Sequence, residues 1–312
     1  MTQSHSANPI WTVTPRMEAM GDALIEELMD VFGQHGLQRD TLGLVVLRDT
    51  SQRPEAFLYR GDWHCYPCSV VKVFHLVHAV AQLEAGLLTP HAELDRALRD
   101  MIMWSSNMAT NYVIDLMTGT TGDTLLAEAE MAEWRQKREG LNDFFRKLGW
   151  AEFDGANINQ KLMDDLRYGR EAIFAGPENE NRNCLTPAVS ARLMAEIFNG
   201  SLPVSDVGLK RVQDTLFRDR SGPLGADPLF QVVNYATGGL PADLPVWSKA
   251  GRLGWTGDPR ICWHKHDLVR TLGRDGTPII ISLMTQGKQI CEDRPETLRE
   301  MGKLIWQRAE AL

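Results

Sequence analysis

Segments that favour β-strands occur at both ends of this chain, and a block of helical patterns separates them. They are 41–48, 55–60, 246–249, 260–272 and 278–285. The last two flank Asp275-Gly276, a dipeptide typical of a tight hairpin turn. Because a strand needs a partner for its backbone groups, both ends of the chain should contribute to one antiparallel sheet. The helical block then forms a separate layer, which predicts two lobes with a ligand-binding cleft between them.

Two predicted helices lie at the chain ends. The first has Thr14 at its N-cap and Pro15 at its first helical position, and the last covers 296–309. The fold class is therefore α/β of the α+β type: an antiparallel five-stranded sheet flanked by terminal helices, plus an all-helical lobe. We expect 1–62 and 206–312 to form the sheet lobe and 63–205 to form the helical lobe.

The composition limits the partners. The chain has 312 residues, 43% of them apolar, and a formal net charge of -8, so nothing in its charge favours nucleic acid or an anionic membrane. No window approaches 18 uninterrupted apolar residues, so we expect no membrane span. The first nine residues lack the apolar stretch of a secretory signal, and five cysteines favour reduced thiols, which together predict a cytoplasmic protein. We expect a small-molecule substrate and no cofactor.

The main chemical signal is Ser69-Val70-Val71-Lys72, at the start of a predicted helix over 69–84. Residues three apart are neighbours on a helix, so the Ser69 hydroxyl and the Lys72 amine should lie together. A hydroxyl beside an amine is the minimum for an acyl-transfer nucleophile and its base. By itself the spacing is equally compatible with an N-cap serine and a surface lysine.

Two further segments favour the catalytic interpretation: Ser105-Ser106-Asn107 in the helical block, and Lys249-Ala250-Gly251 on a predicted strand. In chain order, Ser-x-x-Lys, Ser-x-Asn and Lys-x-Gly resemble the motifs of the serine β-lactamase and penicillin-binding protein superfamily. The chain is most similar to the class A β-lactamases. Cys68 before the serine, the helix start Thr186-Pro187 and the hairpin 273–278 also resemble that class.

The resemblance implies a role for each helical motif residue. Ser69 would attack a carbonyl carbon, and Lys72 would take its proton, provided that burial and nearby positive charge lower the lysine pKa. Ser105 would pass a proton to the leaving group. Asn107 would hold the amide or ester arm of the substrate.

The strand motif would complete the site. Lys249 would supply positive charge near Ser105 or near a substrate carboxylate, and Gly251 would let the strand backbone approach the substrate. The resemblance further implies an oxyanion hole formed by the backbone N–H groups of Ser69 and Arg252. The Arg252 side chain indicates a carboxylate on the substrate, because a guanidinium pairs well with one.

Class A enzymes release the acyl group with a glutamate on an omega loop. At the expected place this chain has Asn159-Gln160, and the nearby acids Glu152, Asp154 and Asp164 lie out of register. The usual route for hydrolysing an acyl-enzyme is therefore missing from the sequence.

Two motif positions also depart from the family. Ala250 stands where β-lactamases carry a hydroxyl that binds the antibiotic, and Ser106 replaces an aspartate. We therefore expect a cytoplasmic serine hydrolase that cleaves an amide or ester of a small molecule through a Ser69 acyl-enzyme. One alternative is a β-lactam hydrolase or DD-peptidase-like enzyme. Another is a non-catalytic sensor of the penicillin-binding type.

Two other chemistries are weaker alternatives. Cys65-Tyr66-Pro67-Cys68 has the spacing of a thiol-disulfide oxidoreductase. Some possible metal ligands alternate along a strand or lie three apart on a helix: Cys262, His264, His266, His75 and His78. The strand pattern and the helix pattern of these possible ligands are both more typical of packing than of metal binding, and we expect no metal site.

Overall fold

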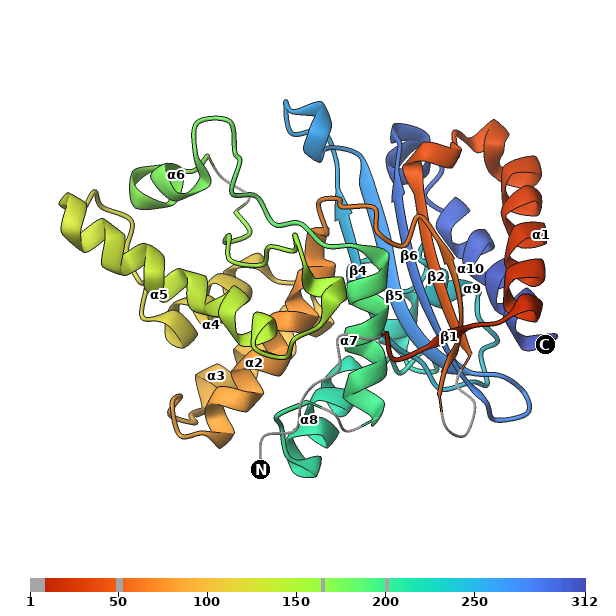
Figure 1. The fold of residues 1–312 in the computed structure, drawn as a ribbon, viewed down its shortest axis with the longest axis horizontal. Helices are drawn as coiled ribbons and strands as arrows, with labels where there is room; N and C mark the ends of the chain where they lie inside the picture. Colours follow the sequence, from red (N-terminus) through yellow and green to blue (C-terminus); the bar gives the residue numbers. More distant parts are fainter. Residues whose placement is uncertain (1–8, 49–52, 164–165, 200–201) are drawn as a thin grey trace.

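The computed structural model describes residues 9–48, 53–163, 166–199 and 202–312. In that part of the chain one sheet has the strand order β1-β3-β2-β6-β5-β4 (Figure 1). The strands are β1 (Thr12–Val13), β2 (Leu42–Arg48), β3 (Glu55–Tyr59), β4 (Trp247–Leu253), β5 (His264–Leu272) and β6 (Pro278–Gln286). The helices are α1 (Pro15–Phe32), α2 (Lys72–Glu84), α3 (Ala92–Met103), α4 (Asn107–Thr118), α5 (Glu128–Arg146), α6 (Gly169–Ala175), α7 (Pro187–Asn199), α8 (Asp206–Leu216), α9 (Ala236–Gly239) and α10 (Thr297–Glu310).

The two ends of the chain meet in the sheet, as predicted. Strand β2 pairs antiparallel with β6 from Leu42 opposite Thr285 to Arg48 opposite Ile279. The fold class is confirmed, but the expected number of five strands is wrong. The sixth strand is β1, which has two residues and pairs parallel with β3. A two-residue strand is too short to produce a periodic pattern in the sequence.

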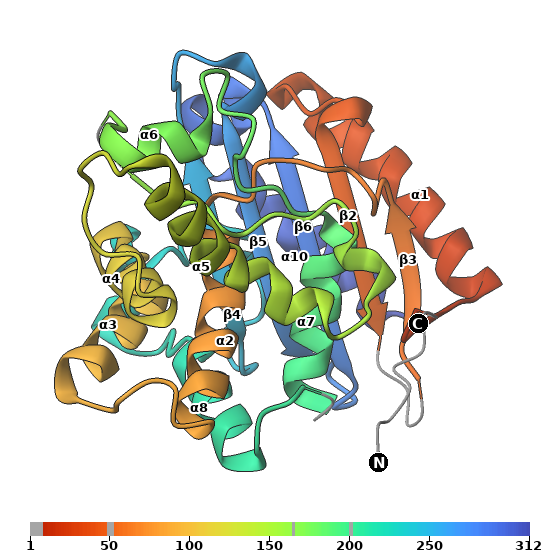
Figure 2. The ribbon, with the colours of Figure 1, turned by 60° about the vertical axis from the view of Figure 1, so that its left-hand side comes forward.

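Helices cover both faces of the sheet (Figures 1 and 2). The terminal helices α1 and α10 pack on one face, and α7 packs on the other. Helix α1 begins as predicted, because the Thr14 hydroxyl accepts a hydrogen bond from the Met17 N–H. Apolar side chains of α1 such as Leu24 and Leu28 are fully buried against the sheet.

The helix predicted over 69–84 has a different first turn. A 3₁₀ turn, η3 (Cys68–Val71), precedes α2, and Cys68 has a left-handed φ of 49°. Residues 72–81 of α2 are all buried, so this helix lies in the centre of the helical layer. The lobe boundaries 1–62, 63–205 and 206–312 stay a prediction. Helix α7 belongs to the predicted helical lobe, and it packs directly onto the sheet.

No described helix is long and apolar enough to cross a bilayer.

Candidate active site

The three sequence motifs converge on the Ser105 side chain. The Lys72 amine, at the start of α2, donates to the Ser105 backbone carbonyl at 2.5 Å and to Asn107 Oδ1 at 2.8 Å. Its distance to Ser105 Oγ is 3.3 Å. The Lys249 amine on β4 reaches the same Oγ at 2.9 Å. Ser105 therefore lies between two fully buried lysine amines, one from each layer of the fold.

The turn between α3 and α4 holds Ser105 and Asn107 in place. Ser105 has a left-handed φ of 56°, which turns the chain sharply after α3. Ser106 is the N-cap of α4, and its hydroxyl accepts from the Ala109 N–H at 3.1 Å. Serine and aspartate are similarly good N-caps, so the change at Ser106 preserves this turn.

Strand β4 touches the turn η3, which contains Ser69, at Gly251. A Cβ at this position would lie 2.6 Å from the Ser69 nitrogen and 2.7 Å from Cys68 Cβ. The close approach requires glycine, and it is an approach to the Ser69 turn, whereas the motif predicted an approach to the substrate. It brings the strand that carries Lys249 against η3, where Ser69 is 9% exposed.

The Lys249 amine also has two acceptors that the sequence did not indicate. It donates to Gln231 Oε1 at 2.8 Å and to its neighbour's carbonyl, Ala250 O, at 2.6 Å. Gln231 lies in a turn 18 residues before Lys249, in a segment without a recognisable motif.

Charge and burial act together on Lys249. Burial lowers the pKa of Lys249 well below its usual range, and a positive charge on Lys72 or on Arg218 lowers it further. Asp267 and Cys68 act in the opposite direction. Arg218 is a second residue that the motifs missed, and its guanidinium donates to the Ser248 carbonyl of β4 at 3.1 Å.

The Arg252 side chain lies outside this group. Strand residues alternate in direction, so Arg252 and Ala250 face away from the side on which Gly251 meets Ser69. Arg252 Nε donates to the Cys291 carbonyl at 3.0 Å. Arg252 lines a cavity of about 290 Å³ together with Lys265 and other residues. Those others are Pro228, Asn234, Tyr235, Cys291, Glu292 and Pro295.

Lys265 is the second cation of this cavity. It pairs with Arg252 across β4 and β5 and is 1% exposed. Burial lowers the pKa of Lys265 to about 8. Lys265 lies on β5, not beside the Lys-x-Gly motif of β4, so the motif did not predict it.

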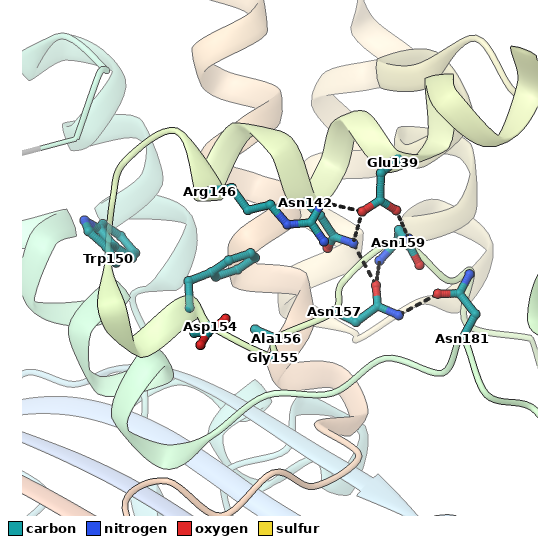
Figure 3. A pocket seen from close by; sticks show the side chains of 11 residues that line it. Glu139, Asn142, Arg146, Trp150, Asp154, Gly155, Ala156, Asn157, Asn159 and Asn181 are labelled. Carbon is teal, nitrogen blue, oxygen red and sulfur yellow. Dashed lines mark hydrogen bonds and ion pairs between the residues drawn. The ribbon is translucent and has the colours of Figure 1, made fainter. Parts of the chain in front are cut away.

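Asn159 and Gln160 belong to a network of amides. Asn159 Nδ2 donates to Glu139 of α5 at 2.5 Å, in a polar pocket of about 480 Å³ that Figure 3 shows. Gln160 Nε2 donates to Asn179 Oδ1 at 2.9 Å. None of the motif residues lines this pocket. These contacts give both side chains a structural role.

The same loop passes close to the Ser-x-Asn helix. Asn111 of α4 donates to the Leu162 carbonyl at 2.8 Å, and the Leu162 N–H donates back to Asn111 Oδ1 at 3.1 Å. The side chain held beside α4 is thus a buried leucine. Of the three nearby acids, Glu152 pairs with Arg192 at 2.7 Å, Asp154 lines the polar pocket, and Asp164 lies outside the described residues.

The alternative chemistries find little support. Cys65 and Cys68 are buried, and burial raises the pKa of both thiols well above their usual range, which disfavours the thiolate that redox exchange needs. Within the described ranges no three potential ligands are grouped around a metal position. His266 makes contacts typical of packing: its ring nitrogens bond to the Tyr66 carbonyl and the Thr285 N–H.

Comparison with known proteins places the geometry in context. Residues 91–309 match the model of the β-lactamase enzyme family. A variant of the class A β-lactamase of the last common ancestor of Gram-negative bacteria is 21% identical, with a TM-score of 0.61 over 91% of this chain and 97% of that chain. The corresponding ancestral enzyme is 20% identical, with a TM-score of 0.61 over 91% of this chain and 98% of that chain.

The structure of PBP-A is 18% identical, with a TM-score of 0.59 over 93% of this chain and 97% of that chain. At such identities these similarities establish a shared fold. No curated protein matches the sequence.

Proposed function

Because the chain belongs to the β-lactamase enzyme family, we propose that it is a serine hydrolase that forms an acyl-enzyme on Ser69 with Lys72 as the base. One observation carries the proposal. Ser105 Oγ lies 3.3 Å from one buried amine and 2.9 Å from another, next to a strand that packs on the Ser69 nitrogen. Such a chain of groups can move a proton between a nucleophile and a leaving group.

In the proposed reaction Ser69 Oγ attacks the substrate carbonyl while its proton passes to Lys72. The N–H groups of Ser69 and Arg252 would hold the oxyanion. Strand β4 is at the edge of the sheet, so every second N–H faces away from β5. As the tetrahedral intermediate collapses, Ser105 gives its proton to the leaving amine or alcohol and receives the proton held by Lys72.

The proposed substrate is a small amide or ester that carries an anionic group. Arg252 and Lys265 line one cavity, with Glu292 as its acid, so the cavity has an excess of positive charge. Guanidinium groups bind carboxylates through paired hydrogen bonds. In this arrangement the substrate crosses the edge of β4, with its scissile bond at Ser69 and its carboxylate at Arg252.

A sensor that keeps its acyl group is the second candidate. Residues 155–163 contain no carboxylate, and the loop presents the buried Leu162 beside α4. An acyl-enzyme without a positioned base for water would persist. We propose the cytoplasm as the compartment, and the five free thiols support a reducing environment.

The test is intact-mass spectrometry after reaction with a fluorophosphonate and, separately, with a penicillin. We expect the fluorophosphonate to label the native protein and the control Ser221→Ala, which removes an exposed hydroxyl, but not Ser69→Ala. Labelling that survives in Ser69→Ala would refute the nucleophile. A persistent penicillin adduct would favour the sensor, rapid release would favour a β-lactamase, and no adduct would favour a different substrate.

A further inference from the structure

Two loops from different parts of the chain meet beyond the end of β4. One joins β4 to β5 and covers 254–263, and the other follows α6 and covers 176–183; both lie at the top of Figure 2. The Arg260 guanidinium of the first loop donates to the Glu178 backbone carbonyl of the second at 2.9 Å, whereas the Glu178 carboxylate is 4.0 Å away. The closer partner is a backbone atom, so this bridge does not depend on the side chain at position 178.

The shape of the 254–263 loop fixes the direction of the Arg260 side chain. The Asp258 carboxylate accepts from the Arg260 backbone N–H at 2.9 Å and from Nη2 of its guanidinium at 2.7 Å. Paired contacts of this kind orient the flat guanidinium group. Gly257 has a left-handed φ of 89°, which allows the turn before Asp258. At the base of the loop, the Trp263 N–H donates to the Gly254 carbonyl at 3.3 Å.

Both loops are tied to the segment just before Ser69. The 254–263 loop contributes to a small buried cluster of three side chains: Tyr66, Cys68 and Ile261. The 176–183 loop leads into Leu185, which exchanges backbone hydrogen bonds with Cys65 at 3.0 and 3.1 Å. The bridge between the two loops therefore lies beside the turn that carries the proposed nucleophile.

The proposed reaction directs the acyl part of the substrate toward this bridge. A carbonyl carbon carries an oxygen, a leaving group and an acyl chain. The oxygen is assigned to the N–H groups of Ser69 and Arg252. The leaving group is assigned to Ser105, which contacts Lys249 in the first half of β4. The acyl chain then extends in the remaining direction along the strand, toward its end and the bridged loops.

We propose that Arg260 is a specificity-determining residue, which closes the acyl end of the site and restricts the substrate to amides or esters of short carboxylic acids. The inference rests on the proposed serine hydrolase function. A short acyl chain ends before the bridge, whereas a long chain must displace Arg260 from Glu178. An exposed ion pair alone adds little, so the barrier comes from the carbonyl contact and from the brace that Asp258 provides. A barrier of this kind discriminates by excluding the wrong substrate.

The test varies the acyl chain and keeps the leaving group. The probes are p-nitrophenyl acetate and p-nitrophenyl octanoate, and acylation of Ser69 is followed by nitrophenolate release and by the intact mass of the adduct, corrected for adducts that Ser69→Ala also forms. Arg260→Met keeps an apolar stem and removes the bridge, and Glu178→Gln keeps the carbonyl. Arg308→Met is the matched control, because it breaks an exposed ion pair that joins α10 to Glu27 of α1.

The expected result is a change in the ratio of the two acylation rates. In the native protein the acetate should acylate Ser69 at least about tenfold faster than the octanoate. In Arg260→Met the octanoate rate should rise about tenfold, while the acetate rate stays within about twofold of the native rate. Glu178→Gln and Arg308→Met should keep the native ratio. Asp258→Asn, which loosens the brace, should fall between the native protein and Arg260→Met.

Hydrogen exchange of 254–263 and 176–183 reports on the bridge without any substrate. Both segments should exchange faster in Arg260→Met than in the native protein or in Arg308→Met. Faster exchange over the whole chain would mark a folding defect, and the milder Asp258→Asn then decides by the same two measurements.

The inference is overturned if the native protein accepts both esters at equal rates. It is also overturned if Arg260→Met leaves the ratio of the two rates unchanged. If neither ester acylates Ser69 in the native protein, the hydrolase proposal fails, and hydrogen exchange alone supports or overturns the bridge between Arg260 and Glu178.

Discussion

Replacing Gly251 with alanine tests the contact between β4 and the turn η3, which contains the proposed nucleophile Ser69. The new Cβ would lie 2.6 Å from the Ser69 nitrogen and 2.7 Å from Cys68 Cβ. Ordinary van der Waals contact begins at 3.4 Å. The strand and the turn must therefore separate by about 0.8 Å, because both neighbours belong to the backbone or lie next to it.

The expected effect on reactivity is larger than the effect on stability. Inserting a methyl group into a packed contact costs about 1–3 kcal/mol. A displacement near 1 Å between a nucleophile and its supporting groups costs about 100-fold in rate. We expect fluorophosphonate labelling of Ser69 in Gly251→Ala to slow by about that factor, measured by intact mass against time. Thermal denaturation on the same samples gives the loss of stability.

Gly254→Ala is the matched control. It lies just beyond the end of the same strand, and its new Cβ would meet Trp263 at 3.9 Å, which is an ordinary contact. We expect labelling and stability close to those of the native protein. Labelling of Gly251→Ala at the native rate, or equal slowing in Gly254→Ala, would refute the role assigned to this contact.

Two further predictions concern buried charges. Arg138→Met removes the fully buried partner of Glu171, 2.7 Å away. We expect the free energy of unfolding, measured by urea titration, to fall by about 3–5 kcal/mol. The control Arg96→Met breaks an exposed ion pair and should change the free energy of unfolding by less than about 1 kcal/mol. Burial raises the pKa of Asp267 from 3.8 to about 6, so the folded state holds this proton more tightly than the unfolded state. Its contribution to stability is present below the unfolded pKa and is lost as the pH rises through about 6. Relative to Asp267→Asn, the native protein should lose up to about 3 kcal/mol between pH 3.5 and 7, and a constant difference would contradict this assignment.

Much of the fold was predictable because its signals are local. The N-cap at Thr14, the hairpin dipeptide Asp275-Gly276 and the helix start at Pro187 are all recorded in neighbouring residues, and each element formed there. The strand ends were less accurate. Strand β4 runs to Leu253 although the pattern ended at 249, because pairing with β5 extends it past the apolar residues.

The site divides in the same way. The spacing of Ser69 and Lys72 and the glycine at position 251 are visible in the sequence alone, and the catalytic roles of Ser69 and Lys72 stay predictions. These patterns consist of residues that are adjacent in the chain or one turn apart, whereas the contact of Gly251 with Ser69 joins distant segments.

Only the tertiary structure revealed the remaining contacts of the candidate site. Gln231 reaches Lys249 from a turn without a motif, Lys265 joins Arg252 from the neighbouring strand, and the alternation of β4 turns the Arg252 side chain away from Ser69. Each of these relations depends on how separate segments pack and on which face of a strand a side chain occupies. A sequence motif records spacing along the chain, whereas proton positions and cavity charge depend on distances through space.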